Sequence, residues 1–227
     1  MARRFVVGDI HGAHRALQQC LERSGFNKQH DWLICLGDVC DGWPDTRDCI
    51  DTLMGITNLV YVLGNHDFHT LQWALHGTQE EGWLAQGGLA TQQSYHFRMP
   101  ETHISFLTNA KPYWVEHNHL FVHAGICPDK QPEQCGLNIL LWDRTLVTRA
   151  LDLVNSGTDS RLTTFDEVYV GHTPIGPRPL KGGEVWMMDT GAGWSGVLSM
   201  MDVDRKEVFA SDPVPLLYPG VEGRKKR

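Results

Sequence analysis

Three short motifs near the start of the chain carry residue types that bind metal ions. They read GDIHG at residues 8–12, GDVCD at residues 37–41 and GNHD at residues 64–67, and each opens on a glycine. Two more histidines, His123 and His172, follow apolar runs later in the chain. Carboxylates and imidazoles together suit manganese, iron or zinc. The set exceeds the roughly four to six ligands of one ion, which predicts two ions that share a carboxylate about 3.5–4 Å apart.

The elements around these motifs are expected to bring them to one edge of a sheet. Strand patterns end at the motif glycines and helix patterns follow them: strands at 5–7, 32–36 and 59–63, and helices at 14–23, 44–54 and 67–76. This alternation predicts a parallel sheet with right-handed crossovers. Ligands of such sheets bind beyond the carboxyl ends of the strands. The polar motif residues should therefore converge on one crevice: Asp9, His11, Asp38, Asp41, Asn65 and His66.

The rest of the chain predicts a cap and further strands within a single domain that spans residues 1–227. Glycines punctuate residues 77–110, which favours an irregular cap of short helical pieces. The remaining expected elements are a hairpin of 113–115 with 120–122, one or two helices over 135–155, and strands at 168–170, 185–188, 197–201 and 207–210. We expect these last four strands to form a second sheet.

Composition excludes several classes of protein and favours a cytoplasmic one. A net charge of −7 disfavours nucleic acid as an obligatory partner, since polyanion binders usually present a basic face. No apolar run is long enough for a membrane span, and motif residues begin too early for a signal peptide. The six cysteines lack zinc-site spacing and predict reduced thiols. The basic end, residues 223–227, is expected to be a solvated, frayed terminus without a role.

The complete motif set resembles the calcineurin-like metallophosphoesterases, and within them the serine/threonine protein phosphatases of the bacterial and phage type. Besides the three early motifs, HAGI at residues 123–126 and GHTP at residues 171–174 are similar to later blocks of that family. DTG at residues 189–191 is similar to its final strand pair. The resemblance spans nearly the whole chain. It implies a four-layer α/β/β/α sandwich of two mixed sheets.

The resemblance also implies a division of the ligands between two divalent ions, manganese by preference and iron or zinc as alternatives. One ion is assigned Asp9, His11 and Asp38, and the other Asp38, Asn65, His123 and His172. Asp38 is then the bridge between the ions. A hydroxide that also bridges the ions is the implied nucleophile, so that no phosphoenzyme intermediate forms.

Further roles follow from the resemblance for residues beside the ions. His66 is implied to be the general acid that protonates the leaving oxygen, with Asp41 orienting it and keeping it charged. The alternative is that His66 only supports the metal ligands from behind. Arg144 and Asn65 are assigned to substrate binding, because a guanidinium fork fits phosphate well.

Two departures from the phosphatase pattern leave the substrate open. Gly42 stands where these phosphatases usually have an arginine, and Arg47 either replaces it or is simply solvated. GNHD and the following FHTL, residues 68–71, resemble diadenosine tetraphosphatases, whereas Asp41 resembles the protein phosphatases. Among the eight tryptophans, Trp43 is the preferred candidate to stack on a substrate, with core packing as the alternative.

These features favour a serine/threonine protein phosphatase that acts on a phosphoprotein or a small phosphoester. The alternative is a diadenosine tetraphosphatase or another nucleotide phosphohydrolase or phosphodiesterase. A third hypothesis, a metal-free binding scaffold, requires eroded ligands, and the expected ligands are all present. The sequence does not indicate an oligomeric state.

Overall fold

A computed structural model describes residues 2–127 and 130–224 of the chain. Its first sheet has the strand order β10-β9-β1-β2-β3. The strands are β1 (Arg4–Val7), β2 (Trp32–Cys35), β3 (Asn58–Tyr61), β9 (Ser199–Asp202) and β10 (Val208–Ala210). The first three are parallel, as the alternation of strands and helices predicts, and β9 pairs antiparallel with β1.

The second sheet has the order β4-β5-β6-β8-β7. Its strands are β4 (Tyr113–Glu116), β5 (His119–Val122), β6 (Glu167–Val170), β7 (Leu180–Gly182) and β8 (Val185–Met187). The expectation that the last four predicted strands share this sheet is wrong for 197–201 and 207–210. These residues form β9 and β10, because the chain returns to the first sheet and covers the edge of β1.

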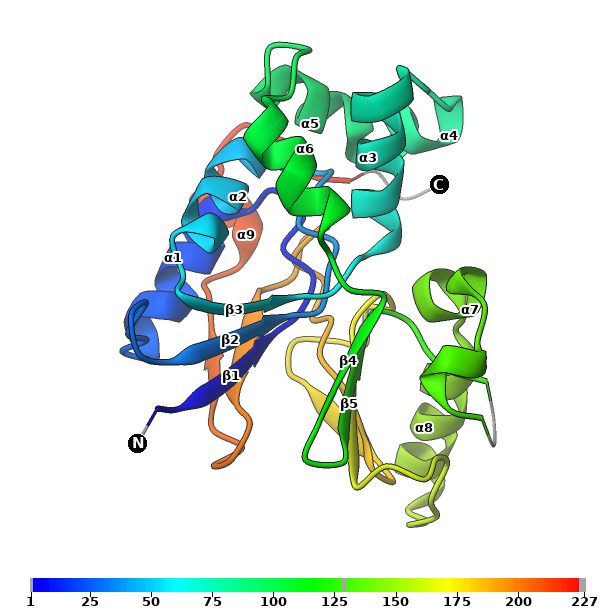
Figure 1. The fold of residues 1–227 in the computed structure, drawn as a ribbon. Coiled ribbons are helices and arrows are strands. Elements are labelled where there is room, and N and C mark those ends of the chain that lie inside the picture. Colours follow the sequence, from blue (N-terminus) through cyan, green and yellow to red (C-terminus); the bar gives the residue numbers. More distant parts are fainter. Residues whose placement is uncertain (1, 128–129, 225–227) are drawn as a thin grey trace.

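Helices cover the outer faces of both sheets (Figure 1). Alternate residues of a strand point to opposite faces of its sheet, so each sheet has one apolar face for the helices and one for the other sheet. Phe5 and Val7 pack with the first outer core, whereas Val6 points into the core between the sheets. Leu120 and Phe121 divide in the same way between the second outer core and the central one. The helices are α1 (His14–Arg23), α2 (Thr46–Met54), α3 (Asn65–His76), α7 (Leu137–Trp142) and α8 (Thr145–Ser156). The structure is thus the expected α/β fold with two mixed sheets.

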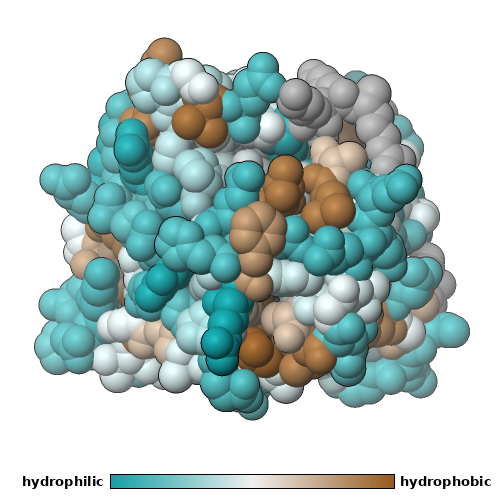
Figure 2. All heavy atoms as spheres, turned by 90° about the horizontal axis from the view of Figure 1, so that it is seen from above, coloured by the Kyte–Doolittle hydropathy of each residue, from teal (hydrophilic) through white to brown (hydrophobic). Residues whose placement is uncertain are grey.

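Residues 77–110 form short helical pieces on one end of the molecule, beside α3 (Figure 1). The pieces are α4 (Glu81–Trp83), a π-helical turn (Leu84–Gly88), α5 (Leu89–Ser94) and α6 (Glu101–Thr108). Figure 2 views this end of the molecule, whose surface is mostly hydrophilic with a few hydrophobic side chains. A short 3-10 helix (Pro132–Gln134) and α9 (Val214–Leu217) complete the described elements.

Two further features concern the cysteines and the helices of the described residues. Each of the six cysteines is a free thiol, and four of them are buried. None of the helices in these parts of the chain has the length and apolarity needed to cross a lipid bilayer.

Candidate active site

The predicted ligands lie in tight loops at the strand ends, and the backbone of these loops is unusual. His11, Asp38, Asp41 and His172 all have positive φ, between 49° and 70°. Non-glycine residues rarely adopt this region, and such strain gathers at functional sites where the surrounding structure holds it. Three of these residues, His11, Asp38 and His172, belong to the candidate metal-ligand groups.

Two glycines make room for the carboxylates. A Cβ atom at Gly64 would lie 2.1 Å from Oδ1 of Asp38, and one at Gly171 would lie 2.1 Å from Oδ1 of Asp9. No side chain fits at either position while the carboxylates stay in place. The glycines of the GNHD and GHTP motifs are therefore spatial requirements of the site.

One group of candidate metal ligands consists of Asp9, His11 and Asp38, whose ligand atoms lie within 4.8 Å of one another. All three residues are buried. Nδ1 of His11 lies 3.0 Å from the carbonyl oxygen of Cys40 and 2.9 Å from that of Asp41, to which it donates. Nε2 is left with its lone pair toward the two carboxylates, which is the usual arrangement of a metal-binding histidine.

A second group consists of Asp38, His123 and His172, again within 4.8 Å. Oδ1 of Asn65 lies 3.0 Å from Nε2 of His123 and 2.9 Å from Nδ1 of His172. Nδ1 of His123 donates to the carbonyl oxygen of Leu36 at 2.8 Å and so leaves Nε2 for a metal. Because Asp38 belongs to both groups, this donor set fits two divalent ions that share one carboxylate.

The electrostatics of the ligands favour cation binding. Burial raises the pKa of Asp9, with the nearby Asp189 carboxylate as the second cause. Burial by itself lowers the pKa of His123, but the Asp38 carboxylate outweighs it, so that the pKa rises to about 10. A buried cluster that holds protons in this way exchanges them for metal ions when it is loaded.

Behind these ligands, His66 and Asp41 form a buried pair, with Nδ1 of His66 2.7 Å from Oδ2 of Asp41. The Asp41 carboxylate also accepts hydrogen bonds from Nε1 of Trp83 at 2.6 Å and from Oγ1 of Thr91 at 2.8 Å. Burial lowers the pKa of His66 to about 3 and raises that of Asp41 to about 7. The direction of this His66 shift disfavours the charged ring that the sequence predicts.

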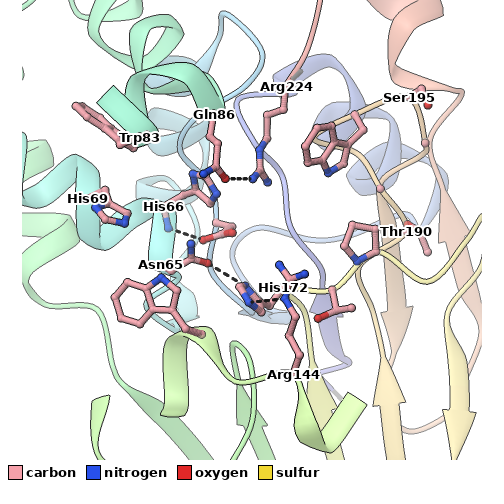
Figure 3. Close-up of a pocket in the computed structure, with 18 of the residues that line it drawn as sticks. Asn65, His66, His69, Trp83, Gln86, Arg144, His172, Thr190, Ser195 and Arg224 are labelled. Carbon is pink, nitrogen blue, oxygen red and sulfur yellow. Dashed lines mark hydrogen bonds between the residues drawn. The ribbon is translucent and has the colours of Figure 1, made fainter. Parts of the chain in front are cut away.

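A cavity of about 920 Å³ opens over Asp38, Asn65 and His66. Its walls include aromatic, amide and guanidinium side chains: His69, Trp83, Gln86, Trp142, Arg144, Trp194 and Arg224. Arg144 and Arg224 reach into it from opposite sides (Figure 3). Nε of Arg144 lies 3.4 Å from Nε2 of His172, at the edge of the candidate metal ligands. The cavity thus brings together candidate metal ligands, the imidazole of His66 and the positively charged side chains of Arg144 and Arg224.

Two candidates from the sequence lie away from this cavity. Trp43 is only 1 % exposed; it donates to the carbonyl oxygen of Ala192 and stacks on Tyr218, so its preferred role as a substrate-stacking residue is wrong. Core packing is its role instead. Arg47 is exposed on α2, where it lies 4.0 Å from Asp51.

Four wall residues were missed as site residues: Gln86, Trp142, Trp194 and Arg224. Trp142 and Trp194 adjoin motifs already noted, at Arg144 and at residues 189–191, so those motifs were the available signal. Nothing in the sequence marks Gln86. The expectation of a frayed, solvated terminus is wrong for Arg224, whose side chain is half-buried against the cavity, while residues 225–227 lie outside the described part.

Comparison with known families agrees with this geometry. The model of the calcineurin-like phosphoesterase family matches residues 2–187. The chain belongs to this family. It is accordingly a phosphoric ester hydrolase of a family that uses a dinuclear metal centre, and the two candidate ligand groups could hold such a pair of ions.

Individual relatives carry two different names. The chain is 28% identical over 172 residues to a symmetrical bis(5'-nucleosyl)-tetraphosphatase of Nitrosomonas europaea, a match that covers 75% of this chain and 58% of that protein. It is 28% identical over 205 residues to serine/threonine-protein phosphatase 1 of Salmonella typhimurium, with 86% and 89% covered. The crystal structure of a putative diadenosine tetraphosphatase matches with a TM-score of 0.68, 19% identity and 93% of both chains, which supports the fold.

Proposed function

We propose that this protein is a serine/threonine protein phosphatase that hydrolyses phosphomonoesters. The observation that carries the proposal is the buried contact of 2.7 Å between His66 and Asp41, next to the metal ligands Asp38 and Asn65. A serine or threonine alkoxide is strongly basic and needs a proton as it leaves, whereas a nucleotide leaves as a stable phosphate anion. A histidine held at this point therefore matches an alkyl phosphate.

The residues of the site divide the work in this proposal. Two divalent ions, manganese by preference, would polarise the phosphate and lower the pKa of the attacking water. Arg144 binds the phosphate oxygens from its position beside His172. Asn65, which contacts His172 from the other side, also binds the substrate. His66, held by the Asp41 carboxylate, would pass a proton to the leaving oxygen.

One relative that aligns over most of both chains supports this choice by its name. Serine/threonine-protein phosphatase 1 of Salmonella typhimurium aligns with 86% of this chain and 89% of its own length. A cytoplasmic location accompanies the proposal, in keeping with the free thiols.

Hydrolysis of a dinucleoside tetraphosphate is the second candidate, and the cavity walls favour it. The rings of Trp142 and His69 meet edge to face with centroids 6.0 Å apart, and Trp194 also lines the cavity. Such surfaces can stack on nucleobases. Several matched relatives are named symmetrical bis(5'-nucleosyl)-tetraphosphatase.

One experiment separates the two candidates. Rates are measured side by side on a phosphoserine peptide, diadenosine tetraphosphate and an aryl phosphodiester, with manganese and with a chelator control. Fast, chelator-sensitive release of phosphate from the peptide alone supports the protein phosphatase. Preference for the dinucleotide overturns it in favour of the nucleotide hydrolase.

A further inference from the structure

The last described residue, Arg224, is held in the cavity by three segments that are distant in sequence (Figure 3). Its backbone N–H donates to the carbonyl oxygen of Gly193 at 2.9 Å, and its guanidinium carbon lies 4.6 Å from the ring centroid of Trp194. One terminal nitrogen donates to Oε1 of Gln86 at 3.0 Å, and the other lies 2.9 Å from Nε2 of His11. This is a fixed position beside a metal ligand, which a solvated tail does not adopt.

The segment that follows Asp41 leaves the room that Arg224 uses. A Cβ atom at Gly42 would lie 3.2 Å from Cγ of Arg224, so a larger side chain there would press on the arginine. Gly223 is packed as closely, because a Cβ atom at that position would lie 2.7 Å from the ring of Trp43. Gly42 and Gly223 thus allow the end of the chain to lie against the loop that carries Asp41.

The guanidinium of Arg224 has hydrogen-bonding capacity that its protein contacts do not use. Its hydrogen-bond partners, His11 and Gln86, are an imidazole and an amide and bring no negative charge. Its Nε–H is buried and has no protein partner. A buried cationic donor without an acceptor is costly, and an oxyanion in the cavity satisfies both its charge and its geometry.

The contact between Arg224 and His11 can exist only while no metal ion is bound to Nε2 of His11. Nδ1 of His11 donates to two backbone carbonyls, so Nε2 offers a single lone pair. That lone pair serves either the arginine or a metal ion. When an ion takes it, the guanidinium is released from His11, while its contacts with Gln86 and Trp194 keep it in the cavity and free to bind an anion.

We infer that Arg224 is a substrate-binding residue, supplied by the C-terminal segment, that grips the phosphate group from the side opposite Arg144. The inference rests on the proposed phosphoester hydrolysis, but it does not depend on what the phosphate is attached to. It also gives a reason for the glycine at position 42, since an arginine from the other end of the chain occupies that side of the pocket.

The test compares Arg224→Ala and Arg224→Lys with Arg47→Ala in the manganese-loaded full-length protein. Arg47 is the matched control, because it is an exposed arginine on α2, outside the cavity. The affinity for inorganic phosphate is measured directly by calorimetry, together with KM and kcat on a phosphoserine peptide and the bound metal per chain. We expect Arg224→Ala to weaken phosphate binding and to raise KM about tenfold or more, with metal content unchanged. Arg224→Lys should recover part of the loss, and Arg47→Ala should match the unaltered protein.

Two results overturn the inference. Phosphate affinity that is unchanged in Arg224→Ala shows that the arginine does not bind substrate. Tighter metal binding and faster turnover in that variant show instead that the contact with His11 is inhibitory. Failure of the peptide assay alone points to the proposed function and not to Arg224, because calorimetry with inorganic phosphate requires no turnover.

Discussion

The floor of the cavity and its walls are built in different ways. The floor is the group of six candidate metal ligands, of which Asp38, Asn65 and His172 line the cavity itself. Asn65 begins α3, and the other five, Asp9, His11, Asp38, His123 and His172, lie in loops that follow strands. The walls consist of Trp83, Gln86, Trp142, Arg144, Trp194 and Arg224, which come from helices and loops outside the sheets. Five of the six floor residues are buried and His172 is half-buried, whereas among the wall residues only Trp83 is buried.

This difference predicts a division of labour. Backbone hydrogen bonds from Ile10 and His11 to the carbonyl oxygen of Asp38 join two of the floor loops, and close glycine contacts restrict the carboxylates. Substitutions there should therefore remove the metal centre. The wall side chains reach the cavity with their terminal atoms and belong to neither candidate metal-ligand group. Substitutions of these residues should therefore alter the affinity for substrate or the rate of hydrolysis while the metal ions remain bound.

Asp38→Asn should abolish both metal binding and activity, with a loss of roughly a thousandfold or more, because its carboxylate belongs to both ligand groups. Metal per chain, measured by mass spectrometry, should fall from about two toward zero. Asp152→Asn, an exposed aspartate on α8, is the control and should keep both ions. Retention of one full ion by Asp38→Asn would contradict the shared carboxylate.

Gly64→Ala should also remove metal, although it alters no ligand. The new Cβ atom would lie 2.1 Å from Oδ1 of Asp38 and 2.2 Å from its backbone nitrogen, so the carboxylate must move. We expect a loss of activity of roughly a hundredfold or more with a matching loss of metal. Gly136→Ala is the control, because its Cβ atom meets nothing within 4 Å. Normal metal content in Gly64→Ala would show that the floor is more adaptable than its contacts indicate.

His66→Asn should keep both ions and lower kcat on a phosphoserine peptide by roughly a hundredfold, because the leaving alkoxide loses its proton donor. An aryl phosphate, whose leaving group needs no proton, should lose much less. The ratio of the two losses is the measurement. Equal losses on both substrates would assign His66 to support of the ligands and not to proton transfer.

The same distinction explains how much of the molecule was predictable from sequence. The floor was predictable because its ligands follow apolar strand patterns within a few residues, and the ends of parallel strands meet. Among the wall residues only Arg144 was predictable, through the family resemblance, because the positions of the others depend on how distant segments pack. Arg224 reaches the cavity only because α9 and the segment after it run back along the first sheet's helices, which no local pattern indicates. The placement of β9 and β10 was missed for the same reason.

Trp83→Phe tests a wall side chain that contacts the Asp41–His66 pair behind the metal ligands. Trp83 comes from α4, yet its Nε1 donates to Oδ2 of Asp41 at 2.6 Å, behind His66. Phenylalanine keeps the ring but removes the donor, so kcat should fall about tenfold while KM and metal content stay the same. Burial raises the pKa of Asp41 to about 7, and the hydrogen bonds that Asp41 accepts lower that pKa. Loss of the Trp83 donor should therefore raise the pKa of Asp41 further.

The acid limb of the pH–rate profile should therefore move to higher pH in Trp83→Phe. Trp73→Phe, a neighbouring buried tryptophan whose ring centroid lies 6.2 Å from that of Trp83, is the control and should leave the profile in place. A shift of equal size in both variants would trace the effect to general loosening of α3 and α4. A shift in Trp83→Phe alone would show that residues 77–110 do more than cover the site, because they supply a hydrogen bond that sets the charge behind His66.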